Sequence, residues 1–480
     1  MEFITIFTII SLSTVFCLVL KNRRLIEFVS VTAFLAVFVL AVSVAVRVSV
    51  AGVYTPNKYF SLDSLGSIVM LLISLVGLMA VIYSVKYLRA ETAKQIIGFT
   101  RVKQYFIFLN LFSLAMFFAI TSSSPIFAWI SVEATTLSTA FLISFYNKPS
   151  SMEAAWKYLI INSVGLLLAF FGTLLYFTSL KMSGGFGFVT WNNLLSNIQS
   201  LDPAIAKIAF VFILIGYGTK VGLAPMHTWL PDAHSKAPVP ISALLSGVLL
   251  NVAFVMILKF KVFTDLVVGP AFAQKLLIAF GLFSIFVAVF IIIGKKNYKR
   301  LLAYSSIENM GILALGFGFG GLAIFAAILH MIYHSLIKSA LFLSAGNIFL
   351  KYSSTKIHNI KGAFTALSLT SVIFMAGFLA ITGAPPFGIL FTKIIILSAG
   401  LKNFSFVSIM ALFLTAVLFI GFFKQVTNMM FGQKPTEIPM EKEKFWLIAP
   451  PLVLIFIALI LSFYIPPFIY NLIASAAANY

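Results

Sequence analysis

The sequence predicts an all-α, polytopic membrane protein with about 14 transmembrane helices. Of its 480 residues, 61% are hydrophobic and only 10% are charged, so the chain cannot present the polar surface of a water-soluble protein. Apolar runs of about 20 residues recur from end to end, and each is long enough as a helix to cross roughly 30 Å of hydrocarbon. Glycine and proline interrupt two of these runs.

Three helices are expected in the N-terminal part, residues 1–102, at 3–20, 25–48 and 65–87. The positive cluster follows the first run instead of preceding it, so this run is predicted to be a retained anchor and not a cleaved signal. The polar stretches at about 181–203 and 431–444 are too short to bury a core of their own. We therefore expect no soluble domain, and any redox chemistry would reside on other chains.

The rest of the chain divides into two units of five helices and a C-terminal segment. Residues 103–262 hold runs at 103–121, 125–146, 156–179, 204–232 and 237–261. Residues 263–432 hold runs at 271–294, 299–319, 321–350, 366–399 and 403–430, and residues 433–480 hold a last run at 445–474. An odd number of helices per unit places the two units in opposite orientations. The interrupted run is the fourth in both, which is typical of an inverted repeat in a transporter.

The basic residues are concentrated in alternate connections between the predicted membrane helices and do not form a nucleic-acid-binding patch. The net charge is +20, but most of the 33 Lys and Arg lie in connections after odd-numbered helices, such as the one that holds Lys295, Lys296, Lys299 and Arg300. Short loops rich in Lys and Arg face the cytoplasm. We predict a multi-pass protein of the cell membrane with both termini on the non-cytoplasmic side and no nucleic-acid partner.

Two runs are broken beside a lysine. Residues 217–225 bracket Lys220 with two glycines and a proline, and residues 383–386 break the later run before Lys393. Proline removes a backbone donor, so a spanning helix tolerates it where the freed carbonyls meet protein or water. The breaks predict hydrated cavities beside both lysines, and the alternative is that each proline only kinks its helix for packing.

Two further charged groups, Glu133 and Lys338, also lie where hydrocarbon is expected. A charge at the bilayer centre costs roughly 2.5–3.5 kcal/mol on insertion scales, and such residues usually mark an ion path. Lys220 is the expected partner of Glu133, because a close carboxylate holds a lysine protonated and its removal favours the neutral amine. A static ion pair between two helices is the alternative.

A polar stripe is predicted in the run at 321–350. His330, His334 and Lys338 are four residues apart, which places them within an arc of about 80° and along roughly 12 Å of a helix. Histidine titrates near neutral pH, so the stripe suits proton transfer. The alternatives are a metal site, for which two histidines are too few ligands, or histidines hydrogen-bonded to Ser335 and Ser344.

Three segments resemble one known family. Residues 218–234 read GTKVGLAPMHTWLPDAH, residues 330–346 read HMIYHSLIKSALFLSAG, and residues 383–393 read GAPPFGILFTK. They are similar to the antiporter-like, proton-translocating membrane subunits of respiratory complex I, Mrp-type sodium/proton antiporters and energy-converting membrane hydrogenases. With the helix count, the resemblance covers nearly the whole chain.

The resemblance implies a proton path along the membrane midplane, with a glutamate, two lysines and a histidine–lysine relay at its centre. His227 and His234 would link this path to water, or serve only at the interface. Many family members carry a lysine where this chain has Asn251, and Lys259, further along the same helix, is either a substitute or a solvated side chain. The implied path residues are Glu133, Lys220, His227, His234, Asn251, His330, His334, Lys338 and Lys393.

Residues 304–311, which contain Ser-Ile-Glu-Asn, look like the hydrogenase branch of the family. Alternatively, Glu308 in this segment is an interfacial carboxylate that balances the positive charge of the basic loop before it. The resemblance implies a proton or proton/sodium translocating subunit of a multisubunit redox complex, with no cofactor in this chain. Iron–sulfur centres, and for the hydrogenase branch a [NiFe] centre, would lie on partner subunits, among them a soluble redox module. The alternatives are a stand-alone Mrp-type antiporter subunit and a transport-inactive assembly scaffold.

Overall fold

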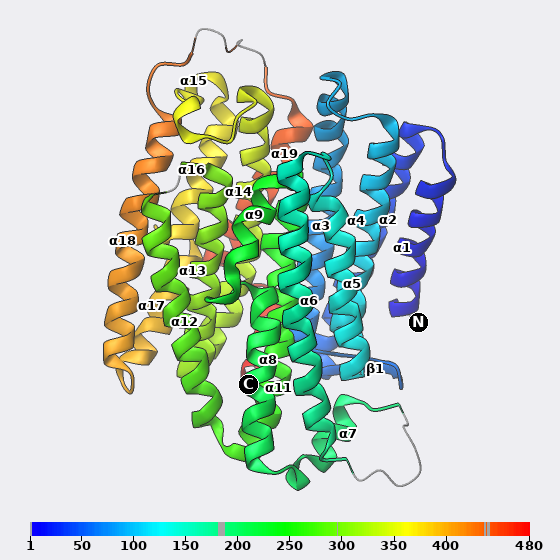
Figure 1. Cartoon of the computed structure of the whole chain (residues 1–480), viewed down its shortest axis with the longest axis vertical. Coiled ribbons are helices and arrows are strands. Elements are labelled where there is room, and N and C mark those ends of the chain that lie inside the picture. The colour runs from blue at the N-terminus through cyan, green and yellow to red at the C-terminus, as the bar shows by residue number, and fades with distance from the viewer. Residues whose placement is uncertain (1, 181–187, 295, 436–437, 439–441) are drawn as a thin grey trace.

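The computed structural model describes residues 2–180, 188–294, 296–435, 438 and 442–480. It is a bundle of long, roughly parallel and antiparallel helices with one short hairpin (Figure 1). Lys295 and parts of the two polar stretches at 181–203 and 431–444 lie outside the described residues. Twelve helices of the described part are long and apolar enough to cross a membrane, and two more are shorter and apolar. The predicted class, a multi-pass α-helical membrane protein, is confirmed.

The first half of the chain follows the predicted runs closely, and α5 and α6 both begin at a proline, which suits the first helical position. The hairpin between the second and third helices was not predicted from the sequence. The elements are α1 (Glu2–Val19), α2 (Arg23–Ala51), β1 (Val53–Asn57), β2 (Phe60–Asp63), α3 (Ser64–Ala93), α4 (Phe99–Thr121), α5 (Pro125–Ile143), α6 (Pro149–Phe177), α7 (Trp191–Asn197), α8 (Pro203–Val221), α9 (Trp229–Lys236), α10 (Val239–Leu244) and α11 (Leu250–Val268).

The second half contains α12 (Pro270–Ile293), α13 (Tyr298–Phe319), α14 (Leu322–Tyr352), α15 (Ala363–Ala366), α16 (Ser368–Thr382), α17 (Gly388–Leu401), α18 (Ser405–Met430), α19 (Phe445–Phe463) and α20 (Pro467–Asn479). The expectation of one unbroken helix at 445–474 is wrong, because the chain leaves the helix after Phe463. Two prolines, Pro466 and Pro467, follow at once, and proline cannot continue a helix from the preceding turn.

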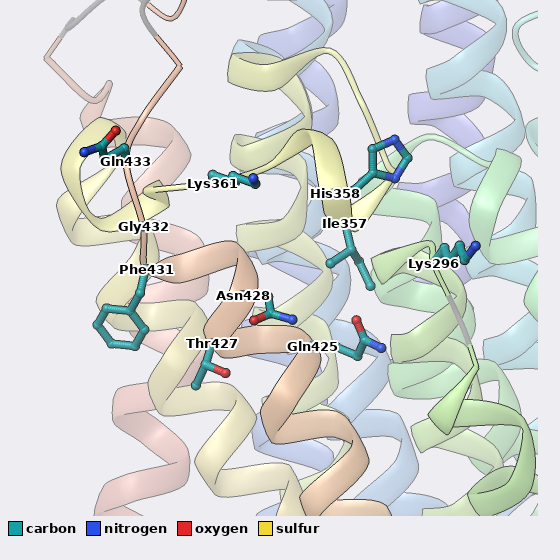
Figure 2. A pocket seen from close by; sticks show the side chains of 10 residues that line it. All are labelled: Lys296, Ile357, His358, Lys361, Gln425, Thr427, Asn428, Phe431, Gly432 and Gln433. Atoms are coloured by element: carbon teal, nitrogen blue, oxygen red, sulfur yellow. The ribbon is translucent and has the colours of Figure 1, made fainter.

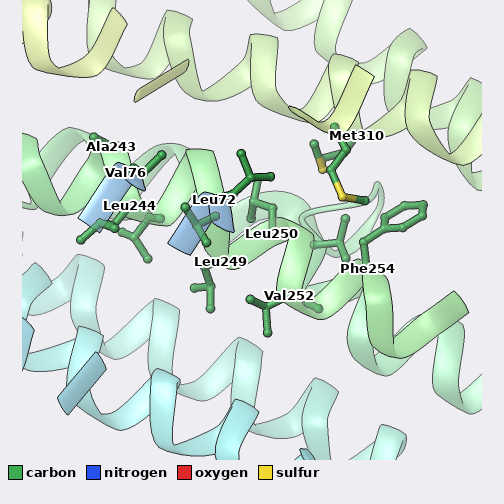
Figure 3. Close-up of a cluster of buried hydrophobic side chains, with 14 of the residues drawn as sticks. Leu72, Val76, Ala243, Leu244, Leu249, Leu250, Val252, Phe254 and Met310 are labelled. Atoms are coloured by element: carbon green, nitrogen blue, oxygen red, sulfur yellow. The ribbon is translucent and has the colours of Figure 1, made fainter. Parts of the chain in front are cut away.

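The centre of the bundle is the segment from α10 into α11, which is buried from Val239 to Leu258. A π-helical turn, Leu245–Leu249, joins the two helices and was not predicted. Leu72 and Val76 of α3 and Met310 of α13 pack around this segment (Figure 3). By contrast, α18 at one edge of the bundle (Figure 1) exposes a row of large apolar side chains, as a lipid-facing helix does.

Both predicted breaks are confirmed, and both use the same cap. At the first, Gly222 has φ +82°, and the amides of Gly222 and Leu223 donate to the carbonyls of Thr219 and Gly218 at 3.1 and 2.9 Å. The second break repeats these bonds at 3.1 and 2.8 Å around Gly383, whose φ is +93°. This is the Schellman pattern, which requires a left-handed residue and therefore favours glycine. Two half-helices, α8 and α16, thus end inside the protein.

The helix that carries Lys220 lies directly against the backbone of α6. A Cβ atom on Gly216 would lie 2.5 Å from the amide nitrogen of Ala169 and 2.6 Å from the carbonyl oxygen of Gly165. We expect Gly216→Ala to lower the free energy of unfolding by about 1–3 kcal/mol, because neither backbone atom can move without separating the helices. Denaturation of the purified protein in mixed micelles measures this loss. Gly98→Ala, where no atom lies within 4 Å of the added Cβ, is the control that should change little.

Candidate functional site

Lys220 lies in the last turn of α8, fully buried, with its ammonium group turned toward α5 and α6. Its Nζ donates to the Thr136 hydroxyl at 2.9 Å and to the Tyr158 hydroxyl at 2.7 Å, and it lies 4.8 Å from the Tyr158 ring centre. The C-terminal end of a helix carries a partial negative charge, which stabilises an ammonium group there. The break that follows therefore helps to hold Lys220 in hydrocarbon.

Glu133 does not form the direct ion pair with Lys220 that the sequence led us to expect. Its Oε1 accepts a hydrogen bond from Ser163 at 2.7 Å, and its Oε2 accepts one from Thr136 at 3.3 Å. Thr136 thus donates to the carboxylate and accepts from the lysine. A hydroxyl can do both at once, so the two charged groups are linked through one exchangeable proton.

Lys393 lies in α17 and forms the buried ion pair that Lys220 lacks. Its Nζ is 2.8 Å from Glu308 Oε1, and it also lies 3.5 Å from the carbonyl oxygen of Ile381 in the last turn of α16. Glu308 is fully buried, so the interpretation of Glu308 as an interfacial carboxylate is wrong. Like Lys220, Lys393 meets the electronegative end of an interrupted half-helix.

The two ends of the predicted polar stripe on α14 are bonded to neighbouring helices. His330 bonds to Thr392 through Nδ1 at 2.9 Å and to Asn309 Oδ1 through Nε2 at 3.1 Å. Asn309 also donates to Glu308 Oε2 at 2.6 Å, so His330 is two bonds from the ion pair. Lys338 donates to the Leu302 carbonyl at 2.5 Å and to Ser305, both in α13.

The middle of the stripe, at His334 and Asn251, is polar but incompletely bonded. Asn251 Nδ2 donates to Ser335 at 2.7 Å and to the Gly247 carbonyl at 3.0 Å, which attaches α11 to α14. Asn251 Oδ1 and both ring nitrogens of His334 have no partner among the described residues, although both side chains are fully buried. Buried polar atoms are usually hydrogen-bonded, so these three atoms are the ones here that suit bonds to water. Ser335 and Ser344 donate to backbone carbonyls and not to the histidines, whereas a neighbouring hydroxyl, that of Thr392, does bond to His330.

His227 and His234 lie on the far side of the first break. His227, in the short helical turn Met226–Thr228, is 7% exposed, and its ring centre lies 6.2 Å from that of Tyr304. His234 in α9 is fully buried and stacks on Phe342 with 4.7 Å between ring centres. Neither ring nitrogen of His234 has a partner in the described part of the chain. Of the two, His234 lies deeper.

Lys259 is neither solvated nor part of this site. Its Nζ lies 3.3 Å from Asp63 Oδ2 and 5.2 Å from the ring centre of Trp191. The side chain is 12% exposed, so the expected solvated position is not observed. Lys259 pairs with Asp63 at the end of the hairpin. It does not replace the lysine that many family members carry at the position of Asn251.

Sequence reasoning missed three residues that connect the site, which are Thr136, Tyr158 and Asn309. It also did not predict that Glu308 pairs with Lys393. Thr136 follows Glu133 by three residues, a spacing that places the two on one helix face, so this link was available from the sequence. Tyr158 and Asn309 carry no charge in an apolar run and therefore give no comparable signal. Their position beside Lys220 and His330 is decided by helix packing.

Two of the cavities lie beside α18. One of about 620 Å³ is lined by α16, α17 and α18 and reaches Lys393. The larger one, of about 1140 Å³, lies at the end of α18 and is lined by the basic residues Lys296, His358 and Lys361 together with amides such as Gln425 and Asn428 (Figure 2). None of the nine predicted path residues lines this larger cavity, so it is separate from the site.

The bundle with two interrupted helices, each ending near a buried lysine, defines a multi-pass membrane subunit, and comparisons with known proteins give its family. Residues 122–419 match the family model described as the NADH:quinone oxidoreductase/Mrp antiporter transmembrane region, and residues 50–95 match the complex I chain 5 N-terminus. The chain belongs to this family of membrane subunits. The prediction made from residues 218–234, 330–346 and 383–393 is therefore confirmed.

Among its relatives, the chain is 40% identical over 347 residues to the hydrogenase-4 component F homolog of Methylacidiphilum infernorum, covering 72% of this chain and 73% of that protein. It is 30% identical over 342 residues to hydrogenase-4 component B of Escherichia coli, covering 68% of this chain and 48% of that protein. The chain thus spans about half the length of several curated relatives. These relatives support the predicted class, a membrane subunit related to those of energy-converting complexes.

Two solved structures share the fold. A chain of the membrane-bound sulfane sulfur reductase, an archaeal respiratory membrane complex, superimposes with a TM-score of 0.88 at 23% identity, over 99% of this chain and 97% of that one. A chain of the Mrp complex from a Dietzia species gives 0.85 at 19% identity, over 100% and 96%. At these identities the likeness concerns the fold, and both neighbours come from multisubunit membrane complexes.

Proposed function

We propose that the chain is a proton-translocating, or proton/sodium-translocating, membrane subunit of a multisubunit redox complex of the hydrogenase-like branch. One observation carries this proposal: two buried lysines, Lys220 and Lys393, each meet the C-terminal end of an interrupted helix and each connect to a buried or half-buried carboxylate. Structural ion pairs do not need broken helices. Ion sites in transporters use them, because the half-helix end supplies partial negative charge beside water.

The first lysine site can store and release a proton. When Glu133 is ionised, its charge acts on Lys220 through the Thr136 hydroxyl and favours the ammonium form. If Glu133 takes up a proton, or moves away from Thr136, burial favours the neutral amine, and Lys220 releases its proton. The Tyr158 hydroxyl, 2.7 Å from Nζ, is a second group that can accept from the ammonium or donate to the amine.

The second lysine site is built differently and suits the receiving end. Lys393 is paired directly with Glu308, and Asn309 holds Glu308 beside His330, so a proton that His330 releases to water here finds a carboxylate and an amine in contact. Protonation of Glu308 would release Lys393 from the pair and let its ammonium group turn toward the 620 Å³ cavity that it lines. The Lys393 ammonium group then releases its proton into this cavity, away from the membrane midplane.

The segment between the two sites runs through Asn251, Ser335, His334 and Lys338. Three buried atoms in this segment, Asn251 Oδ1 and the two His334 ring nitrogens, have no partner among the described residues. We propose that water molecules bond to them and complete the path. We also propose that residues 103–262 and 263–432 are the two units of an inverted repeat, since the Schellman caps at Gly222 and Gly383 have the same hydrogen bonds.

Replacing Asn251 tests whether the path crosses the gap left by the absent lysine. We expect Asn251→Leu to slow proton translocation by about tenfold or more, because it removes the donor to Ser335 and the acceptor for water. The rate is measured as acidification of vesicles that contain the assembled complex. Asn110→Leu, which removes a similarly buried amide bonded to Ser13 in another part of the bundle, is the matched control. Equal rates for both variants would favour the scaffold function.

The proposed partners are other membrane subunits and a soluble redox module that carries iron–sulfur and, in the hydrogenase branch, [NiFe] centres. The proposed location is the cell membrane with both termini on the non-cytoplasmic side, since Lys- and Arg-rich connections favour the cytoplasm. The function is tested by purifying the complex through a tag on this chain, identifying its soluble subunits by mass spectrometry, and measuring reductant-driven acidification of vesicles. A complex that lacks every redox subunit and exchanges sodium for protons would support the Mrp-type function instead, which the likeness to the Dietzia complex favours.

A further inference from the structure

A buried carboxylate outside the proposed path lies near the end of α3. Glu91 has 0% of its surface exposed, and its Oε1 accepts a hydrogen bond from the Tyr146 hydroxyl at 2.6 Å. Its Oε2 has no partner among the described residues, and no basic nitrogen of that part of the chain lies within 4 Å of it. Glu91 is therefore a carboxyl group held only by a phenol.

Glu27, at the same end of the bundle, shows how the protein neutralises a buried carboxylate that serves packing. It is 3% exposed, pairs with Arg23 at 2.8 Å, and also bonds to Arg89 of α3. Such pairing compensates the cost of removing a charge from water. Glu91 lies less than one turn from Arg89 along α3 but lacks this compensation, so it is poised to bind a proton.

A surface cavity of about 350 Å³ lies next to Glu91 along α3. Ala90 and Lys94, which flank Glu91 in α3, line this cavity together with Asn347 of α14. The Tyr87 hydroxyl lies 3.2 Å from that of Tyr146, which bonds to Glu91. Two tyrosine hydroxyls are thus bonded in series to Glu91.

Tyr83 links these tyrosines to a residue that lines the cavity, Asn347. The Tyr83 hydroxyl donates to Asn347 Oδ1 at 2.8 Å, and its ring stacks on that of Tyr87 with 5.7 Å between centres. Asn347 in turn donates to Thr370 at 3.1 Å, and Thr370 bonds to Glu443, which also lines the cavity. Hydrogen bonds thus connect Glu443 at the cavity, through Thr370 and Asn347, to Tyr83 inside the bundle.

A buried lysine of α13 lies near Glu91. Lys299 is 4% exposed, although the sequence placed it in a basic loop. Its Nζ donates to the carbonyl oxygens of Ala237 at 2.8 Å and of Ser235 at 3.5 Å. These carbonyls belong to the backbone next to His234, whose two ring nitrogens are unpartnered in the described residues.

We propose that Glu91 is a proton-loading site, which takes protons from the 350 Å³ cavity and passes them by way of Lys299 and His234 to the path on α14. A hydronium ion in the cavity donates to the Glu91 carboxylate and leaves as water, and the neutral carboxyl group then donates to the Lys299 amine or to a water beside it. His234 accepts the proton from that group and regains its neutral form on donating to the path. This inference rests on the proposed function.

The charged and titratable groups around Glu91 come from four parts of the bundle and all bear on its proton affinity. They are Tyr83, Tyr87 and Lys94 of α3, Tyr105 of α4, Tyr146 after α5, and Lys299 of α13.

The test compares Glu91→Gln with Glu153→Gln in the complete complex reconstituted in vesicles. Glu153 is an exposed carboxylate on α6 that pairs with Lys157. We expect Glu91→Gln to slow proton translocation by about tenfold or more, Glu91→Asp to restore part of the rate, and Glu153→Gln to leave it unchanged. A second readout is labelling by a hydrophobic carbodiimide, which attacks protonated carboxyl groups. Labelling of Glu91 should fall as pH rises, and Tyr146→Phe should shift this profile.

The outcomes separate this inference from the proposed function. A Glu91→Gln complex that pumps at the wild-type rate, while Lys220→Met blocks pumping, overturns the loading role alone. If Lys220→Met also pumps normally, the proposed function itself fails. Where Glu91→Gln does not assemble, labelling of the unchanged complex decides, and a Glu91 that never reacts with the carbodiimide at any pH contradicts the proposal.

Discussion

A complex that carries Lys220→Met is expected to assemble and to translocate protons at least about a hundredfold more slowly than the wild type. Methionine fills nearly the same volume but cannot bind a proton, so the links to Thr136 and Tyr158 are lost while the packing of α8 on α6 remains. The measurement is acidification of vesicles per assembled complex, with assembly followed by gel filtration. Electron transfer by the redox partners should slow with it if the two processes are coupled.

Lys261→Met is the matched control for this variant. Lys261 is also buried, at 1% exposed, but its Nζ bonds to Asp265 at 2.6 Å and to the carbonyl oxygen of Tyr480, away from the path. Its loss should reduce stability and leave the rate per assembled complex near the wild-type value. A Lys220→Met complex that pumps as well as Lys261→Met would rule out the relay.

Removing one partner of the buried Glu308–Lys393 pair is expected to be the most destabilising single change in the site. Glu308→Ala leaves the Lys393 ammonium group without its 2.8 Å partner, and an uncompensated buried charge costs about 3–5 kcal/mol. Denaturation of the purified protein in mixed micelles measures the loss. Translocation should fail as well, because His330 and Asn309 then lead to no carboxylate.

The double variant Glu308→Ala with Lys393→Met separates charge from packing. With both charges gone, much of the lost stability should return, but translocation should remain absent. Glu153→Ala, which removes an exposed carboxylate, controls for the change in net charge. If Glu308→Ala is no less stable than Glu153→Ala, the pair does not carry the buried charges that the second site requires.

The two interrupted helices and their lysines were predictable because hydropathy, glycine and proline act locally. A run of apolar residues must form a helix in lipid, and a Gly-Pro interruption must be accommodated within protein or water. Gly222 and Gly383 cap α8 and α16 as these rules require. The Asn251 amide was likewise visible as a departure from the family pattern.

The pairings of these groups were not predictable. Lys220 was expected to pair with Glu133 because both were predicted to lie in hydrocarbon, whereas Thr136 lies between them. An interfacial position was one of two interpretations of Glu308 because a basic loop precedes it, whereas α13 places it beside Lys393. Lys299 was counted as a loop residue and is buried.

The amino-acid sequence alone determined that this chain spans a bilayer, where two of its helices break, and that Lys220 and Lys393 lie beside these breaks, since each of these depends on neighbouring residues and on the thickness of the membrane. Only the tertiary structure decided which acid faces which base, which hydroxyl lies between them and which carboxylate, Glu91, is left with a phenol. Those contacts join residues up to about 85 positions apart, such as Glu308 and Lys393, and depend on the rotation and depth of whole helices.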